Sequence, residues 1–187
     1  MQVELERRLF HIGFGTLLAL LLYFNLINKA HLAILLVISL ATFLIYRRWK
    51  IPLIHQAMLI LERKENLKTF PGIGAFFYLL GCTIAAWIYP TEIAVASILI
   101  LAWGDGAGAL IGTHGKLPYL NPKKMWEGIL FGIIAGTIAA QFFVPLLQAF
   151  AAAAICMLIE GLDLRKYRLD DNLLIPILAG IIITMMR

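Results

Sequence analysis

Long apolar runs, separated by short polar linkers, follow one another along almost the whole sequence. A helix that crosses a bilayer needs about 20 mostly apolar residues, within a range of about 17–25. The runs predict seven spanning helices, of which the second and the last are short. They cover residues 9–27, 31–46, 72–90, 92–112, 126–143, 145–161 and 173–186. The pattern therefore predicts an all-α, polytopic transmembrane helical bundle, with residues 1–187 forming a single integral membrane domain.

Two segments need a separate interpretation. The first apolar run follows Arg7 and Arg8, as the core of a signal peptide would, but it continues to about Ile27 without a small-residue cleavage site. We interpret it as a retained membrane helix. The segment from Lys50 to Glu65 is too short, and too charged at its end, to span comfortably. We expect an interfacial helix or a helical hairpin arm there, with a linker that rests on lipid as the alternative.

The composition agrees with a lipid environment. The chain is 61% hydrophobic and 14% charged, whereas soluble domains average about 45–50% apolar and about 25% charged residues. Cys82 and Cys156 lie inside apolar runs, where we expect inert packing thiols rather than a disulfide.

Charge is divided unequally between the two sides of the predicted bundle. With the N-terminus in the cytoplasm, 14 of the 16 Lys and Arg residues are cytoplasmic, and only Lys29 and Arg187 are external. This division follows the positive-inside rule. All acids except Glu92 lie on or near the same side, and since acids do not set topology, their position favours an active cytoplasmic face. For the net charge of +5 we expect lipid and phosphate partners rather than nucleic acid.

Glycines recur at every fourth position in two of the predicted helices. One seam comprises Gly104, Gly108 and Gly112, and the other comprises Gly128, Gly132 and Gly136. A stripe without side chains lets another helix approach closely. Helix packing is the usual role of such seams, and they also suit a homo-oligomer.

Asp105 interrupts the first glycine seam. It lies about thirteen residues into the fourth predicted span, roughly 20 Å from the external end at about 1.5 Å per residue. A carboxylate at that depth costs several kcal/mol unless it is paired, hydrated or bound to a cation. We therefore interpret Asp105 as functional, with a water-accessible surface carboxylate as the alternative.

Further polar residues fall at the same predicted level. They are His114, Gly115, Lys116, Lys123, Lys124, Glu127, Glu160, Asp170, Asp171 and Asn172. Phosphoryl chemistry uses such groups, because acids hold Mg²⁺, lysines contact phosphates, and glycines admit backbone N–H groups. Helix capping is a competing role for Asp171 and Asn172. His11 lies near the same face, where packing competes with a functional role.

The central stretch resembles the polyprenol kinase group, which includes dolichol kinases, phytol kinases and CTP-dependent diacylglycerol kinases. From Gly104 to Gly128 it reads Gly-Asp-x-x-small-x-x-x-Gly-x-x-Gly-Lys, followed by Lys-x-x-Glu-Gly. Residues 6–11, 71–81 and 160–176 resemble further motifs of the family, so most of the chain is covered. Three positions depart from the family pattern. Met125 and Ile129 stand where hydroxyl residues are usual, and Gly108 replaces an alanine.

The resemblance implies transfer of the γ-phosphate of CTP to the hydroxyl of an isoprenoid or other lipid alcohol. On that basis we expect Asp105, with Glu127 or Asp171, to be catalytic and to hold Mg²⁺. We expect Lys116, Lys123 and Lys124 to contact phosphates. The remaining expected nucleotide-binding residues are Gly104, His114, Gly115, Glu160 and Asn172, with His11 on the lipid side.

Two other functions remain open. A CDP-lipid synthase, resembling phosphatidate cytidylyltransferases, would use the α-phosphate of CTP, but the short Asp171-Asn172 segment favours the kinase. A small transporter could also use intramembrane acids. Its pathway would need polar groups at several depths, whereas the external halves of the predicted spans are almost wholly apolar. The sequence leaves the alcohol unidentified.

Overall fold

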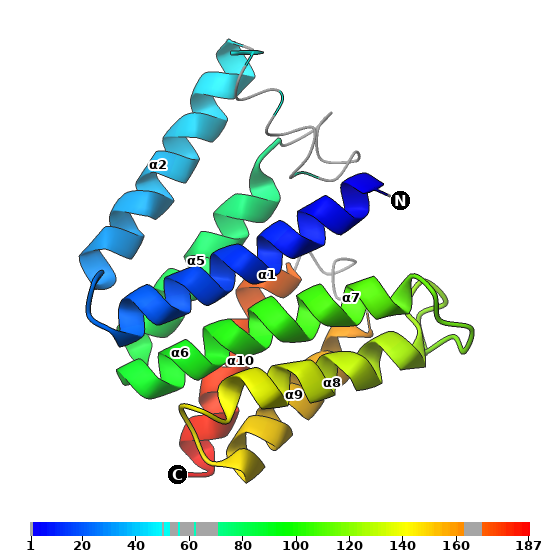
Figure 1. Cartoon of the computed structure of the whole chain (residues 1–187). Coiled ribbons are helices and arrows are strands. Elements are labelled where there is room, and N and C mark those ends of the chain that lie inside the picture. Colours follow the sequence, from blue (N-terminus) through cyan, green and yellow to red (C-terminus); the bar gives the residue numbers. More distant parts are fainter. Residues whose placement is uncertain (1, 50, 53–55, 57–61, 63–70, 163–169) are drawn as a thin grey trace.

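A computed structural model describes residues 2–49, 51–52, 56, 62, 71–162 and 170–187 (Figure 1). These residues are helical apart from short connections and one isolated β-bridge between Pro118 and Met125. The helices are α1 (Gln2–Tyr23), α2 (Lys29–Arg48), α5 (Ile73–Ile88), α6 (Thr91–Leu99), η1 (Ile100–Asp105), α7 (Gly106–Gly112), α8 (Trp126–Ala140), α9 (Leu146–Glu160) and α10 (Asp171–Met185). The predicted all-α fold is confirmed, and each of the seven predicted segments coincides with helix.

The first helix differs most from its prediction, because α1 begins at Gln2 rather than at residue 9. Its polar first turns are stabilised by ion pairs from Glu4 to Arg7 and Arg8, at the three- and four-residue spacings that bring side chains together on a helix. The helix ends at Tyr23, shortly before Asn25 turns the chain with a φ of 55°. Apolar periodicity locates the membrane-like part of such a helix but not its charged extension.

The continuous helix formed by α6, η1 and α7 is the centre of the bundle. It packs against α1, α5, α8, α9 and α10, and 83% of the residues in an 18-residue apolar window within Thr91–Gly112 are buried. By contrast, α2 packs mainly against α5 and only 11% of Lys29–Tyr46 is buried, so it lies at the periphery in Figure 1. Within the described residues, these two helices are long and apolar enough to cross a membrane.

The two glycine seams face each other across the contact between α7 and α8. A Cβ atom on Gly108 would lie 2.8 Å from the carbonyl oxygen of Gly128, and one on Gly132 would lie 2.6 Å from that of Gly104. Backbone this close admits no side chain, so the predicted packing role is confirmed. Because each seam covers the other within one chain, neither is free to pair two copies, which corrects the expected basis for a homo-oligomer.

One end of the bundle gathers the polar segments. The N-terminus of α1, the end of α7 and the start of α8 lie at that end in Figure 1. Most of the segment from Lys50 to Glu65, with its His55, and the basic run Arg165–Arg168 lie outside the described residues. Cys82 and Cys156 are buried and free, as predicted.

Candidate active site

Asp105 ends the π-helical segment η1 and is buried, with an exposed fraction of only 4%. Its Oδ2 atom accepts a hydrogen bond from Nη1 of Arg8 at 3.1 Å, and Nε2 of His11 lies 3.5 Å from the same oxygen. Nε2 of His11 also lies 3.3 Å from the carbonyl oxygen of Leu101, one turn earlier in η1. Single π-helical turns are frequent at functional sites. Here the turn brings a buried acid against two nitrogen-bearing side chains of α1.

Arg8 is held from its other side by Glu4. Nε of Arg8 donates to Oε1 of Glu4 at 3.1 Å, and the same oxygen accepts from Nη2 of Arg7 at 2.5 Å. Sequence reasoning missed Glu4 and Arg8 as site residues, because it assigned the basic pair to topology. The signal was present in the spacing, since Glu4, Arg8 and His11 are four and three residues apart and therefore share one face of a helix.

The first cavity, called here the Asp105 cavity, has a volume of about 220 Å³ and lies between α1, α5 and the start of α10. Asp105, Arg8, His11 and Asn172 are among the polar residues that line it. Its apolar lining includes Phe10, Phe14, Tyr78 and Leu79. The cavity is therefore amphipathic, with a buried acid at its polar end.

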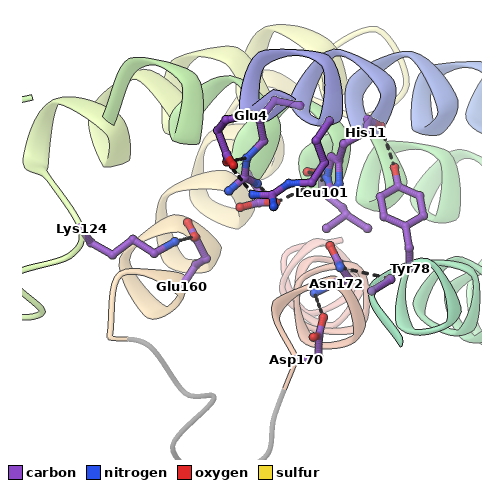
Figure 2. A network of polar contacts seen from close by, with 12 residues as sticks. Glu4, His11, Tyr78, Leu101, Lys124, Glu160, Asp170 and Asn172 are labelled. Carbon is purple, nitrogen blue, oxygen red and sulfur yellow. Dashed lines mark hydrogen bonds and ion pairs between the residues drawn. The ribbon is translucent and has the colours of Figure 1, made fainter. Parts of the chain in front are cut away.

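The walls of the Asp105 cavity are fixed by hydrogen bonds between distant segments (Figure 2). The hydroxyl of Tyr78 donates to the carbonyl oxygen of His11 at 3.3 Å, and the two rings meet edge to face at 4.7 Å. Nδ2 of Asn172 donates to the carbonyl oxygen of Gly74 at 3.3 Å, while its backbone N–H donates to Asp170. Asp170 is the N-cap of α10, so the predicted capping role in this segment belongs to it.

Glu62 is a second buried acid in this wall that sequence reasoning missed. Its Oε2 atom accepts hydrogen bonds from the backbone N–H groups of Gly72 at 2.9 Å and Gly74 at 3.2 Å, at the start of α5. Gly72 has a φ of 88°, which other residues rarely adopt, so the family-like Pro-Gly-x-Gly motif supplies the N–H donors that hold the Glu62 carboxylate. The sequence gives no spacing that would join residue 62 to it.

The second cavity, called here the Lys124 cavity, has a volume of about 170 Å³. It is lined by Glu4, Arg8, Gly108, Ala109, Gly112, Thr113, Lys123, Lys124, Met125, Gly128, Ile129 and Glu160. Lys124 forms an ion pair with Glu160 across it, as Figure 2 shows. Cationic side chains beside glycine backbone suit a phosphate group. Arg8 lines both cavities, so it stands between a lysine-rich space and the buried acid.

Glu127 takes a different place from the predicted one. Its Oε1 atom accepts hydrogen bonds from the backbone N–H groups of Lys116 at 2.8 Å and Leu117 at 3.2 Å. The carboxylate thus anchors the loop that precedes α8. Lys116 and His114 lie exposed on this loop, and Gly115 lies against Glu127 and Met125.

The predicted site residues therefore separate into groups. Asp105, His11 and Asn172 meet in the Asp105 cavity, and Lys123, Lys124 and Glu160 meet in the Lys124 cavity. Gly104 packs in the glycine seam. Asp171 is buried at the start of α10.

The sequence predicts that Mg²⁺ binds Asp105 together with Glu127 or Asp171. Within the described part of the chain, no three His, Cys, Asp or Glu side chains are grouped so that they could hold one ion. Asp105 is bound to Arg8 and Glu127 to loop amides, so these two carboxylates are engaged by protein groups rather than grouped around Mg²⁺. In nucleotide-using sites this ion is held by one or two carboxylates together with the phosphates, and its presence here stays a prediction tied to the nucleotide.

Comparison with known proteins gives three informative relatives. An uncharacterized protein of Methanocaldococcus jannaschii is 31% identical over 96% of this chain and 92% of its own length. A CTP-dependent diacylglycerol kinase of Eremothecium gossypii is 28% identical over 95% of this chain. A phytol kinase of Synechocystis is 30% identical over 59% of it. No family model matches the chain, and no solved structure matches it significantly.

These relatives define the class as phosphotransferases that use an alcohol as acceptor. Within that class, the chain belongs to the family of polyprenol and lipid kinases that contains the diacylglycerol and phytol kinases, and it shares this family with the archaeal protein. The chain spans 65% of the length of the matched diacylglycerol kinase and 47% of that of the phytol kinase.

Proposed function

We propose that this protein transfers the γ-phosphate of CTP to the hydroxyl group of a lipid alcohol. The observation that carries the proposal is the buried carboxylate of Asp105, which lines an amphipathic cavity and is held by Arg8, a residue that also lines the neighbouring lysine-lined cavity. A kinase of this kind must bring together an apolar molecule that ends in a hydroxyl and a polyanionic nucleotide. The amphipathic Asp105 cavity suits the alcohol, and the neighbouring lysine-lined Lys124 cavity suits the nucleotide.

In the proposed reaction the alcohol oxygen attacks the γ-phosphorus of CTP. The new O–P bond forms as the bond from phosphorus to the β,γ-bridging oxygen breaks, and CDP leaves. Asp105 or His11, which face each other at 3.5 Å, accepts the hydroxyl proton. Arg8 and Lys124 stabilise the negative charge on the phosphate oxygens, so positioning and electrostatics supply most of the rate. Mg²⁺ bound to the nucleotide would neutralise further phosphate charge.

The proposal includes a multi-pass membrane setting with the polar end of the bundle in the cytoplasm. Large apolar side chains lie on the outside of the bundle, among them Val37, Phe142 and Leu147 with exposed fractions of 64%, 74% and 69%. Such a surface suits hydrocarbon better than water. The distribution of Lys and Arg supports a cytoplasmic N-terminus. In that orientation, soluble CTP reaches the polar end directly.

The names of the relatives support both substrates. The diacylglycerol kinase is CTP-dependent by name, and diacylglycerol and phytol are both lipid alcohols. We therefore include isoprenoid alcohols, such as polyprenols and dolichol-like alcohols, and diacylglycerol as acceptors. The shared chemistry is a hydroxyl group at the end of a long apolar molecule.

A screen of lipid alcohols against CTP and ATP tests the proposal. Purified protein in lipid vesicles is incubated with farnesol, phytol, a polyprenol or diacylglycerol, and the products are identified by mass spectrometry. We expect a lipid monophosphate and CDP with at least one alcohol. A CDP-lipid and pyrophosphate, formed from an added lipid phosphate, would instead identify a CDP-lipid synthase. Formation of neither product, with ion flux across the vesicle membrane, would identify a transporter.

A further inference from the structure

The Asp105 cavity has two chemically different sides. Asp105 and His11 lie at one, whereas Phe10, Phe14 and Leu79 contribute to the other. Phe10 and Phe14 are four residues apart on α1, and their rings stack with centroids 5.5 Å apart and planes inclined by 8°. They therefore form a continuous aromatic wall that leads along α1 toward the buried acid.

Phe10 stands at the outer edge of this wall. Half of its surface is exposed, whereas Asp105 at the inner end is 4% exposed. An approach to the acid along this wall thus passes two aromatic side chains, and Arg7 and Glu62 also line the cavity. Charged groups of a nucleotide would lose hydration against this aromatic wall, whereas a hydrocarbon chain would not.

We propose that the Asp105 cavity binds the lipid alcohol, which enters sideways between α1 and α5 past Phe10 and Phe14, while the triphosphate binds in the Lys124 cavity. This inference rests on the proposed kinase function and assigns its two substrates to separate cavities. The hydroxyl then lies beside Asp105 and His11, and the first part of the hydrocarbon lies against Phe14 and Leu79. Arg8, which lines both cavities, marks the point where the substrates meet.

A larger apolar groove offers a competing place for the lipid. It has a volume of about 610 Å³ and is lined by parts of α1, the central helix and α8, including Trp103, Phe131 and Phe142. Its lining is almost wholly apolar, and Asp105 does not contribute to it. Because Trp103 and Asp105 are two residues apart on a helix, they point to roughly opposite sides. A hydroxyl in the groove would therefore lie on the wrong side of the central helix for transfer.

Photolabelling separates the two locations without requiring catalysis. Farnesol carrying a diazirine group is irradiated with the full-length protein in lipid vesicles, with and without excess unlabelled farnesol, and the labelled peptides are sequenced. We expect displaceable label in residues 10–14 of α1 and 75–79 of α5. Displaceable label confined to residues 131–143, in α8 and the turn that follows it, or no displaceable label at all, would overturn the inference.

A matched pair of variants tests the same assignment kinetically, using farnesol as the acceptor or the alcohol that the screen identifies. Phe14→Trp adds bulk to the Asp105 cavity, and Phe131→Trp adds the same bulk to the groove. We expect Phe14→Trp to raise the KM for the alcohol about tenfold, which corresponds to about 1.4 kcal/mol, with the KM for CTP changed less than about twofold. Phe131→Trp should leave both values near wild type. The opposite pattern would contradict the inference.

Two arrangements keep the result interpretable. Should Phe14→Trp fail to fold, Phe10→Trp, at a half-exposed position, replaces it with the same expected direction and the same contradicting pattern. Failure of the kinase function is seen separately, because the wild-type protein would then form no lipid phosphate with any alcohol. Displaceable label in α1 and α5 would still support an alcohol site in that case.

Discussion

The two cavities at the polar end share Arg8 but differ in almost everything else around it. The Asp105 cavity combines the buried acids Asp105 and Glu62 with aromatic and aliphatic walls, and the Lys124 cavity combines lysines and acids with glycine backbone. One arginine can contact both spaces because its Nε atom bonds Glu4 while its Nη1 atom bonds Asp105. From this difference we infer that the residues lining each cavity select the substrate that binds there, and that the reaction occurs where the two cavities meet.

The largest expected effect comes from removing the charge of Asp105. Asp105→Asn keeps the shape of the side chain but removes the buried negative charge that holds Arg8 and lies beside His11. We expect the rate at saturating substrates to fall about 10²–10³-fold, the range found when one preorganised electrostatic group is removed from an active site. Initial rates of lipid phosphate formation measure this effect. A folded variant within threefold of the wild-type rate would contradict the role of Asp105.

The next effect tests the link between the cavities. Arg8→Lys keeps a positive charge, but a lysine cannot bond Glu4 and Asp105 at once with the fixed fork of a guanidinium. We expect the rate at saturating substrates to fall about 10–100-fold, since the charged hydrogen bonds concerned are worth about 1.5–3 kcal/mol each. Arg7→Lys is the matched control, because Arg7 bonds Glu4 but not Asp105. An equal loss of rate in Arg8→Lys and Arg7→Lys would contradict a role of Arg8 in linking the two cavities.

A smaller effect distinguishes the two binding spaces. Lys124→Met removes a cation from the Lys124 cavity, so we expect the KM for CTP to rise about tenfold while that for the alcohol changes less than about twofold. Lys123→Met should have a weaker effect, because Lys123 is exposed and better screened by water. Steady-state kinetics with each substrate varied in turn measures the KM for CTP and the KM for the alcohol in both variants. A rise confined to the KM for the alcohol would indicate instead that the alcohol binds in the Lys124 cavity and CTP in the Asp105 cavity.

The smallest effect concerns the loop anchored by Glu127. Glu127→Gln weakens the acceptance of the Lys116 and Leu117 N–H groups without removing the side chain. We expect the KM for CTP to rise about threefold, in line with roughly 0.5–1 kcal/mol for one weakened hydrogen bond at an exposed site. A loss as large as that of Asp105→Asn would restore Glu127 to the catalytic role that its motif predicted.

Apolar periodicity was enough to predict the helices, because a spanning segment is long and its composition differs strongly from that of a linker. It also led to Asp105, since a charge inside an apolar run is costly without a function, whereas Lys124 was predicted from the basic loop that follows this run. It did not lead to the pairing of Asp105 with Arg8, 97 residues apart, which depends on how α1 crosses the central helix. The sequence placed Glu127 and Asp105 at a similar membrane depth, but depth alone could not show that Glu127 binds loop amides while Asp105 lines a cavity.

Incubation of the purified protein with CTP labelled radioactively at either the γ- or the α-phosphate tests the central claim most directly. A lipid alcohol is supplied in vesicles, and label in the extracted lipid is counted for each nucleotide. Transfer to the alcohol predicts label in the lipid from γ-labelled CTP and none from α-labelled CTP, with the signal lost in Asp105→Asn. Label from α-labelled CTP, or none from either nucleotide with any of the alcohols, would contradict the proposed function.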